Sequence, residues 1–179
     1  MENNKRSKKY DVERASLFLY LNKHCWNGLC RYSITKDGFL KFNVPYAKYK
    51  TVNCPKDKLY FCQNHLKSHD VQIENKDFRE IFDMVNPGDM IYCDPPYVPI
   101  SDTAYFTEYA GGTFTEKDQR DLLDLSLKAA QKGCKVVISN SLCDKTLDLY
   151  DGLDYEEIKV VRNIGRGESV KELIVTIGS

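Results

Sequence analysis

The sequence predicts an α/β fold preceded by a small helical and β-hairpin segment, and three observations support this. From residue 70 onward, apolar runs of strand length alternate with segments of helical periodicity. An Asp37-Gly38 turn separates two alternating runs, which is typical of a β-hairpin. The apolar run 89–93 is followed by Asp94-Pro95-Pro96-Tyr97. In α/β sheets ligands bind beyond the carboxyl ends of strands, so this polar loop is the first candidate site.

The composition allows one substantial hydrophobic core. The chain has 179 residues, of which 42% are hydrophobic. It contains no run of 18 apolar residues and no apolar stretch near Met1, so we expect a soluble, cytoplasmic protein without a membrane span or signal peptide. The seven cysteines lack paired metal-ligand spacing, so buried, reduced thiols are expected rather than zinc or disulfides.

The net charge is zero, but positive and negative residues are unevenly distributed along the chain. Residues 1–58 carry thirteen Lys/Arg against five Asp/Glu, which gives +8, and residues 59–179 carry thirteen against twenty-one, which gives −8. A polyanion such as DNA would meet the basic segment through phosphate contacts. A solvated lysine-rich surface explains the same charge pattern equally well.

The first part of the chain predicts a helix and a protruding hairpin. Apolar residues between Val12 and Leu21 fall on one helical face, so a helix is expected to run to about His24 with Asp11 as its cap. The hairpin covers about residues 31–45. It is basic and aromatic, with too little apolar surface for a core, and a two-stranded ribbon fits the DNA major groove.

The remaining elements follow from periodicity and from turn residues. Thr115 to Asp118 resembles a capping box that opens a helix closed by Gly133. We expect residues 1–69 to form a target-recognition subdomain and residues 70–179 to belong to a catalytic domain. The other expected elements are helices near 59–66, 78–85 and 142–149, and strands at 71–74, 89–93, 134–139, 155–161 and 173–177.

The Asp-Pro-Pro-Tyr loop suits a bound exocyclic amine. Two prolines fix φ near −65° and remove two N–H donors, so the loop presents carbonyl acceptors in a fixed curve. The Asp94 carboxylate and the Pro95 carbonyl could each accept one N6 hydrogen of adenine while Tyr97 stacks on the base. This arrangement primes the nitrogen to attack a methyl sulfonium. The alternative is a Pro-Pro turn that only ends a strand.

Several further blocks share one pattern: residues 17–22, Asn27-Gly28-Leu29-Cys30-Arg31-Tyr32, residues 42–45, residues 92–97, Phe114-Thr115 and residues 138–140. With these blocks the chain resembles the Dam family of DNA adenine-N6 methyltransferases, whose members act on GATC. The resemblance implies the C-terminal part of a class I S-adenosylmethionine-dependent methyltransferase with a Rossmann-like sheet, joined to a DNA-recognition subdomain. It makes Asp94, Pro95, Pro96 and Tyr97 the catalytic residues.

The resemblance also implies which residues contact double-stranded DNA. Trp26 would fill the gap left by a flipped adenine, and Asn27 would hold the orphaned thymine. Trp26 departs from the Tyr usual in the family. Taken alone, Trp26 is more typical of a core residue and Arg31 of a surface charge. The expected base-reading residues are Leu29, Arg31, Pro45 and Tyr49.

The methyl donor implied by the resemblance is S-adenosylmethionine, with no metal. Asp77 and Phe78 would hold its adenine, and Asp94 would lie beside it. An N-cap explains Asp77 equally well. The segment 105–112 resembles a loop over the site, and residues 162–169 would contact the DNA backbone.

The N-terminal motifs of the family are not found in this sequence. The family begins with a segment that carries Lys, then has a Phe-x-Gly-x-Gly loop on its first strand and an acidic residue on its second, and this pattern is not found here. No Gly-x-Gly follows an apolar strand before residue 28. The two missing strands would lie between the strands at 71–74 and 89–93. We therefore expect a split or truncated methyltransferase, which is either active alone or completed by a missing N-terminal partner fragment.

The expected function is site-specific adenine-N6 methylation of a GATC-like target, by direct transfer without a covalent enzyme intermediate. A bacterial, phage or mobile-element setting such as restriction–modification fits this activity. The alternative is a catalytically inactive fragment that only binds DNA through its hairpin.

Overall fold

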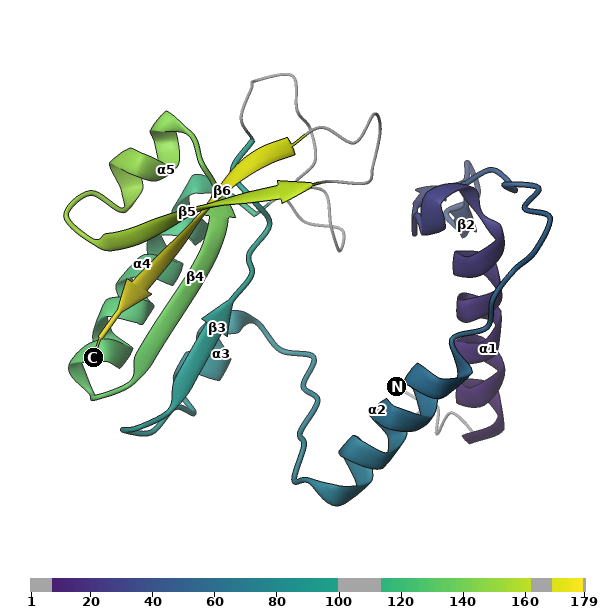
Figure 1. The fold of residues 1–179 in the computed structure, drawn as a ribbon, viewed down its shortest axis with the longest axis horizontal. Coiled ribbons are helices and arrows are strands. Elements are labelled where there is room, and N and C mark those ends of the chain that lie inside the picture. Colours follow the sequence, from purple (N-terminus) through teal and green to yellow (C-terminus); the bar gives the residue numbers. More distant parts are fainter. Residues whose placement is uncertain (1–7, 100–113, 162–168, 179) are drawn as a thin grey trace. The chain divides into compact units, whose positions relative to one another are not determined.

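The computed structural model describes residues 8–99, 114–161 and 169–178 (Figure 1). The chain divides into two compact units, residues 1–72 and residues 73–179, and each is described by itself. Among the described residues, no helix is both long enough and apolar enough to cross a membrane.

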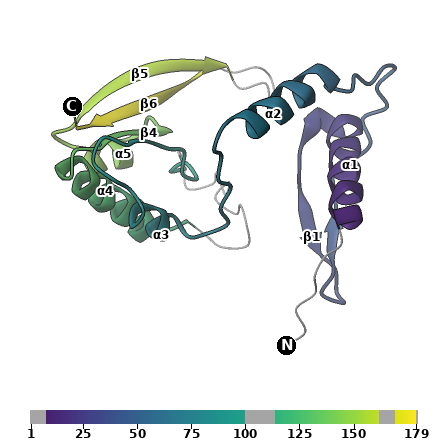
Figure 2. The same ribbon diagram turned by 90° about the horizontal axis from the view of Figure 1, so that it is seen from below.

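The first unit contains two helices and the hairpin (Figure 2). The first helix ends at His24, as the sequence predicts. It already includes Lys8, so Asp11 lies in its first turn, and the prediction of Asp11 as the cap is wrong. The elements are α1 (Lys8–His24), the 3₁₀ turn η1 (Trp26–Gly28), β1 (Tyr32–Ile34), β2 (Leu40–Phe42) and α2 (Lys56–Ser68).

The hairpin has one apolar and one polar face. β1 and β2 pair antiparallel, with Tyr32 opposite Phe42 and Ile34 opposite Leu40. Since side chains alternate along a strand, these four share one face, and the rings of Tyr32 and Phe42 meet edge to face with centroids 5.6 Å apart. Ser33 opposes Lys41 on the other face.

The first unit has almost no buried core of its own. Cys25 is the only buried side chain among its described residues. The apolar residues expected to pack on one face of α1 include Val12, Leu17 and Phe18, and all three are exposed. The hairpin is exposed as well, which agrees with the expectation that it protrudes.

The second unit is a mixed α/β structure. Its sheet has the order β3-β4-β6-β5, in which β3 runs parallel to β4 and the other neighbours are antiparallel. The elements are α3 (Phe78–Phe82), β3 (Met90–Cys93), α4 (Glu116–Gln131), β4 (Lys135–Ser141), α5 (Asp144–Leu149), β5 (Asp154–Val161) and β6 (Ser169–Ile177).

The strand expected at residues 71–74 is absent from the structure. These residues have no regular secondary structure, and Ile73 is 82% exposed. An extended run becomes a strand only when a neighbour accepts its backbone hydrogen bonds. Within the described residues β3 pairs with β4 alone, so no strand is present there to pair with residues 71–74.

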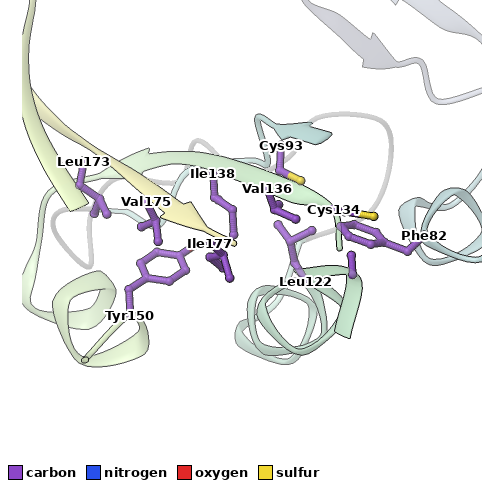
Figure 3. Close-up of a cluster of buried hydrophobic side chains, with 11 residues drawn as sticks. Phe82, Cys93, Leu122, Cys134, Val136, Ile138, Tyr150, Leu173, Val175 and Ile177 are labelled. Carbon is purple, nitrogen blue, oxygen red and sulfur yellow. The ribbon is translucent and has the colours of Figure 1, made fainter. Parts of the chain in front are cut away.

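The core of the second unit lies between the sheet and helices on one of its faces. Leu122 of α4 packs beneath Val136, and Tyr150, which directly follows α5, lies beneath the strands near Val175 (Figure 3). The side chains of Ile138 and Leu173 are fully buried at the centre of the sheet. This core fixes the ends of β3 and β4, where the polar loop begins.

Two local predictions have different outcomes. The capping box at Thr115 is confirmed, because the Thr115 and Asp118 side chains each accept a backbone N–H of the other residue. The expectation that the cysteines are buried is wrong for Cys30, Cys54 and Cys62, which are exposed. All three exposed thiols belong to the first unit, where little apolar packing is available to cover them.

Candidate functional site

The Asp-Pro-Pro-Tyr loop begins at the carboxyl end of β3. Cys93 is the last residue of this strand and pairs in register with Ile138 of β4. This register places Asp94 next to Ser139, whose hydroxyl donates to Asp94 Oδ1 over 3.1 Å. The hydroxyl of Tyr92 in turn donates to Ser139 Oγ over 3.2 Å. Asp94 is an exposed residue, and among the described residues its carboxylate is held at Oδ1 alone, which leaves Oδ2 available to a ligand.

Tyr97 is held at its hydroxyl. Its O–H donates to Oε2 of Glu172, a buried carboxylate on β6, over 3.2 Å. Burial raises the pKa of Tyr97 to about 12. At neutral pH the ring is therefore an uncharged phenol, and its distal end is anchored to the sheet.

The thiol at the end of β3 is not a nucleophile at neutral pH. Cys93 is buried, and this burial raises its pKa to about 11. Because the thiolate is the nucleophilic form, a thiol with this pKa is almost entirely protonated at pH 7. The loop therefore offers hydrogen-bond acceptors and an aromatic ring, but no activated cysteine.

Asp77 and Phe78 form the corner where α3 begins. Asp77 is the N-cap of α3, and its Oδ1 accepts the backbone N–H of Arg79 over 3.0 Å. The N-cap role considered for Asp77 is thus confirmed. The Phe78 ring lies 5.6 Å from the ring of Phe114, centroid to centroid, so the corner combines a carboxylate with two aromatic rings.

Arg79 joins this corner to the first turns of α4. Its guanidinium contacts Asp118 Oδ1 over 2.5 Å and Asp121 Oδ2 over 2.6 Å. It also contacts the Asp77 carboxylate over 3.1 Å. One guanidinium therefore bridges three carboxylates, and it fixes α3 against α4 beside Phe78.

Stability at acid pH should depend on the Arg79 cluster. Hydrogen bonds lower the pKa of all three carboxyls in this cluster. The main donor is the Arg79 backbone for Asp77, Thr115 for Asp118 and Lys117 for Asp121. The Arg79 side chain lowers each of the three pKa values further. Carboxyls whose pKa is lower when folded stabilise the fold above their unfolded pKa, about 4, and this stability is lost as the pH falls. We expect Arg79→Met to reduce the fall in melting temperature between pH 5 and pH 2.

Arg120→Gln is the matched control for this prediction. Arg120 is exposed on α4, the helix that carries Asp118 and Asp121, and the substitution also removes one positive charge. It should leave the acid dependence of the melting temperature at its wild-type size. An acid dependence that is the same in Arg79→Met and in the wild type would contradict the role given to the cluster.

The predicted base-flipping residues lie on a tight, exposed turn of the first unit. Trp26 is 56% exposed, and Asn27 adopts the left-handed conformation with φ 52° and ψ 21°. Asn is among the few residues with a side chain that tolerate this region, and Gly28 follows with φ 65°. The turn therefore presents Trp26 at the surface, contrary to the core position typical of a lone tryptophan.

Two of the predicted base readers, Pro45 and Tyr49, each accept a backbone N–H of this turn. The Pro45 carbonyl accepts the N–H of Trp26 over 2.9 Å, and the Tyr49 hydroxyl accepts the N–H of Asn27 over 3.1 Å. The Asn22 side chain donates to the Gly28 carbonyl over 2.6 Å. Residues far apart in the sequence thus hold the Trp26-Asn27 pair in one conformation.

Leu29 and Arg31 connect this turn to the hairpin. Leu29 is half-buried, its carbonyl lies 3.2 Å from the Cys25 thiol, and Arg31 is exposed. The Arg31 carbonyl accepts the N–H of Asn43, so strand-like pairing continues past β1. By alternation Arg31 shares the polar face of the hairpin with Ser33 and Lys41.

The structure separates the predicted site residues into two groups. The predicted DNA-contacting residues, from Trp26 to Tyr49, all belong to the first unit, whereas Asp77, Phe78 and the Asp94 loop belong to the second. The proposed loop at 105–112 lies entirely outside the described residues, and so does the proposed backbone contact at 162–169 except for Ser169.

Sequence reasoning missed several polar residues that contact the loop. Glu172 takes a buried position on β6 directly before the buried Leu173, and Gln119 takes a core-facing position one turn before Leu122 on α4. A polar residue at an apolar position signals a buried hydrogen bond, and this signal could have identified both. Ser139 and Asn140 belong to the block 138–140 that carries the family resemblance, but no contact partner was predicted for either.

Comparison with known proteins finds similarity to DNA methyltransferases. Residues 1–164 match the family model of D12 class N6 adenine-specific DNA methyltransferases. The chain is 38% identical over 173 residues to a DNA adenine methylase of Haemophilus influenzae, a match that covers 93% of this chain and 58% of the relative.

Two further relatives show similar coverage. A DNA adenine methylase of Vibrio cholerae is 40% identical over 154 residues, covering 86% of this chain and 53% of the relative. A type II methyltransferase of Lactococcus lactis is 32% identical over 171 residues, covering 93% of this chain and 59% of the relative. The chain thus spans between 53% and 59% of the length of these three relatives.

Proposed function

The chain belongs to the family of D12 class N6 adenine-specific DNA methyltransferases, and from this membership we propose that it methylates adenine N6 in double-stranded DNA. The single observation that carries the proposal is the anchored loop at the end of β3. The Asp94 carboxylate, bound by Ser139 at Oδ1, and the Tyr97 ring, bound by Glu172 at its hydroxyl, both belong to this loop.

The loop residues would hold the amine of a flipped adenine. Asp94 Oδ2 and the Pro95 carbonyl accept one N6 hydrogen each, which directs the nitrogen lone pair out of the plane of the base. The Tyr97 ring, an uncharged phenol whose pKa burial raises to about 12, stacks on the base. The proton that N6 releases on methylation passes by way of the exposed Asp94 carboxylate to water.

The corner at Asp77 and Phe78 fits the adenine end of S-adenosylmethionine. The Arg79 guanidinium lies 4.3 Å from the centroid of the Phe78 ring, so the other face of this ring, beside Phe114, would stack on the adenine. The Asp77 carboxylate, which also accepts from Arg79, would accept from the exocyclic amine. Bound S-adenosylmethionine would supply the methyl group as an activated sulfonium. The neutral Cys93 thiol agrees with direct transfer to nitrogen without a covalent enzyme intermediate.

The first unit would provide target recognition, with a GATC-like sequence as the target. Arg31, on the polar face of the hairpin, would pair with O6 and N7 of a guanine. Leu29, Pro45 and Tyr49 would complete the base-reading surface. The exposed Trp26 would occupy the gap left by the flipped adenine while Asn27 meets the orphaned thymine.

Base flipping can be tested without catalysis. In a duplex with 2-aminopurine in place of the target adenine of GATC, binding should raise the fluorescence, because an unstacked 2-aminopurine is no longer quenched. Trp26→Ala should reduce this rise, and Trp26→Phe should retain most of it because a ring still fills the gap. A scrambled duplex should show no rise, and an equal rise on both duplexes would contradict site-specific flipping.

A further inference from the structure

We propose that Gln119 and Asn140 are positioning residues that fix the backbone on both sides of Tyr97, an inference that rests on the proposed function of the Asp94 loop. Neither side chain belongs to the loop itself. Gln119 lies in the second turn of α4, and Asn140 lies near the end of β4. Both are buried, with exposed fractions of 5% and 0%.

The Asn140 amide uses its full hydrogen-bonding capacity. Its Nδ2 donates to Gln119 Oε1 over 3.1 Å and to the Tyr150 hydroxyl over 3.2 Å. Its Oδ1 accepts the N–H of Val98 over 3.0 Å and the N–H of Ser141 over 2.9 Å. An amide flip would turn the NH₂ group toward two N–H donors, so only one orientation satisfies the site.

Gln119 transmits this orientation to the loop. With its Oε1 committed to Asn140, its Nε2 faces the Pro96 carbonyl and donates to it over 2.9 Å. A flipped Gln119 would lose both hydrogen bonds. The direction of the Pro96 carbonyl therefore follows from the orientation of Asn140 two hydrogen bonds away.

The two amides thus hold both peptide groups that flank Tyr97. The Pro96 carbonyl is bound by Gln119, and the Val98 N–H is bound by Asn140. The Ser141 hydroxyl also donates to the Val98 carbonyl over 2.6 Å. Because Pro95 and Pro96 have no N–H, the loop has few donors with which to secure itself, and these external partners set its path.

The position of Gln119 indicates a role beyond packing. Leu122, Ser126 and Ala129 continue its buried face along α4, and an apolar residue at 119 would continue that face without an internal amide. Asp118, the preceding residue, contacts Arg79 beside Phe78. Adjacent residues of α4 therefore hold the Asp77-Phe78 corner and the Asp94 loop, and α4 links the two candidate subsites.

The experiment compares two Gln119 variants with Arg120→Gln in the full chain. Gln119→Met keeps the side-chain length and removes both hydrogen bonds. Gln119→Glu keeps an acceptor for Asn140 but replaces the donor to the Pro96 carbonyl. If Gln119→Met fails to fold, Gln119→Glu still tests the contact with the loop. Arg120 is exposed and adjacent, so Arg120→Gln controls for a substitution in α4.

Four quantities are measured for each variant: amide hydrogen exchange of the segment that contains Val98, the melting temperature, kcat, and KM for DNA. Both Gln119 variants should raise loop exchange at least about tenfold, with smaller changes in the exchange of β4. They should lower kcat about 10- to 100-fold and leave KM for DNA within about twofold, because the reacting groups are misplaced. Arg120→Gln should match the wild type.

Exchange and activity separate the inference from the proposed function. Unchanged loop exchange in folded Gln119 variants would overturn the positioning role, whatever their activity. The positioning role would also be overturned if kcat fell in proportion to the fall in melting temperature in all three variants. The wild type could transfer no methyl while the Gln119 variants still show increased loop exchange. This result would support the positioning role and would contradict only the proposed methylation.

Discussion

Replacing Asp94 with alanine is expected to lower methyl transfer to adenine N6 by about 100- to 1,000-fold or more. The substitution removes an acceptor placed against the attacking nitrogen, and groups of this kind commonly supply effects of that size. DNA affinity should change little, because the residues proposed to read the target lie in the first unit. Single-turnover methylation, measured beside equilibrium binding to the same duplex, checks both statements.

Asp94→Asn is the matched variant for this prediction. It keeps the side-chain size and one carbonyl acceptor, and it removes the negative charge that Ser139 binds. We expect its activity to lie between those of the wild type and Asp94→Ala. If Asp94→Ala instead lost DNA binding while its melting temperature stayed unchanged, the catalytic role of Asp94 would be wrong.

Replacing Arg31 with alanine is expected to weaken discrimination between GATC and a duplex with one substituted base pair. A bidentate arginine–guanine contact supplies about 1–3 kcal/mol of discrimination, or about 5- to 150-fold. Arg31→Lys should recover only part of the loss, because lysine lacks the planar fork that matches guanine O6 and N7. Binding competition between the two duplexes at fixed salt measures the ratio.

Lys41→Ala is the control for Arg31. Lys41 shares the polar face of the hairpin, so it is placed to meet phosphate. Its loss should weaken binding to both duplexes equally and reduce the slope of log affinity against log salt by about one. An Arg31→Ala variant that behaved in the same way would show that Arg31 contacts phosphate and not a base.

The parts of the fold that could be predicted are those set by short-range chemistry. Asp37-Gly38 favours a hairpin turn, and Gly38 has a φ of 81° that a residue with a side chain rarely adopts. The Thr115 capping box depends on residues within one helical turn. The placement of Asp94 after a strand follows from an apolar run that ends in two prolines, since proline cannot continue a strand ladder.

The parts that could not be predicted depend on partners distant in sequence. Residues 71–74 have a strand-like pattern, yet a strand also requires a neighbour, and no described strand lies beside them. The apolar face expected on α1 has the right periodicity, but exposed Leu17 and Phe18 show that periodicity does not identify the surface that would cover it.

The residues that support the candidate site could not be predicted from local sequence patterns either. The Asp94 loop was recognised from its own four residues, whereas its partners come from α4, β4 and β6, between 23 and 75 residues away in sequence. Gln119 and Glu172 are polar residues at positions where the pattern expects apolar ones. Such mismatches indicate that a buried hydrogen bond exists, but only the structure identifies its partner.

The most direct test of the central claim is transfer of labelled methyl from S-adenosylmethionine by the full chain to a duplex that contains GATC, compared with a scrambled duplex of equal composition. The account predicts label on adenine N6 of the GATC duplex, little label on the scrambled duplex, and a loss of label with Asp94→Ala. Selective binding to GATC without any transfer of label would contradict methylation by this chain and leave only DNA recognition.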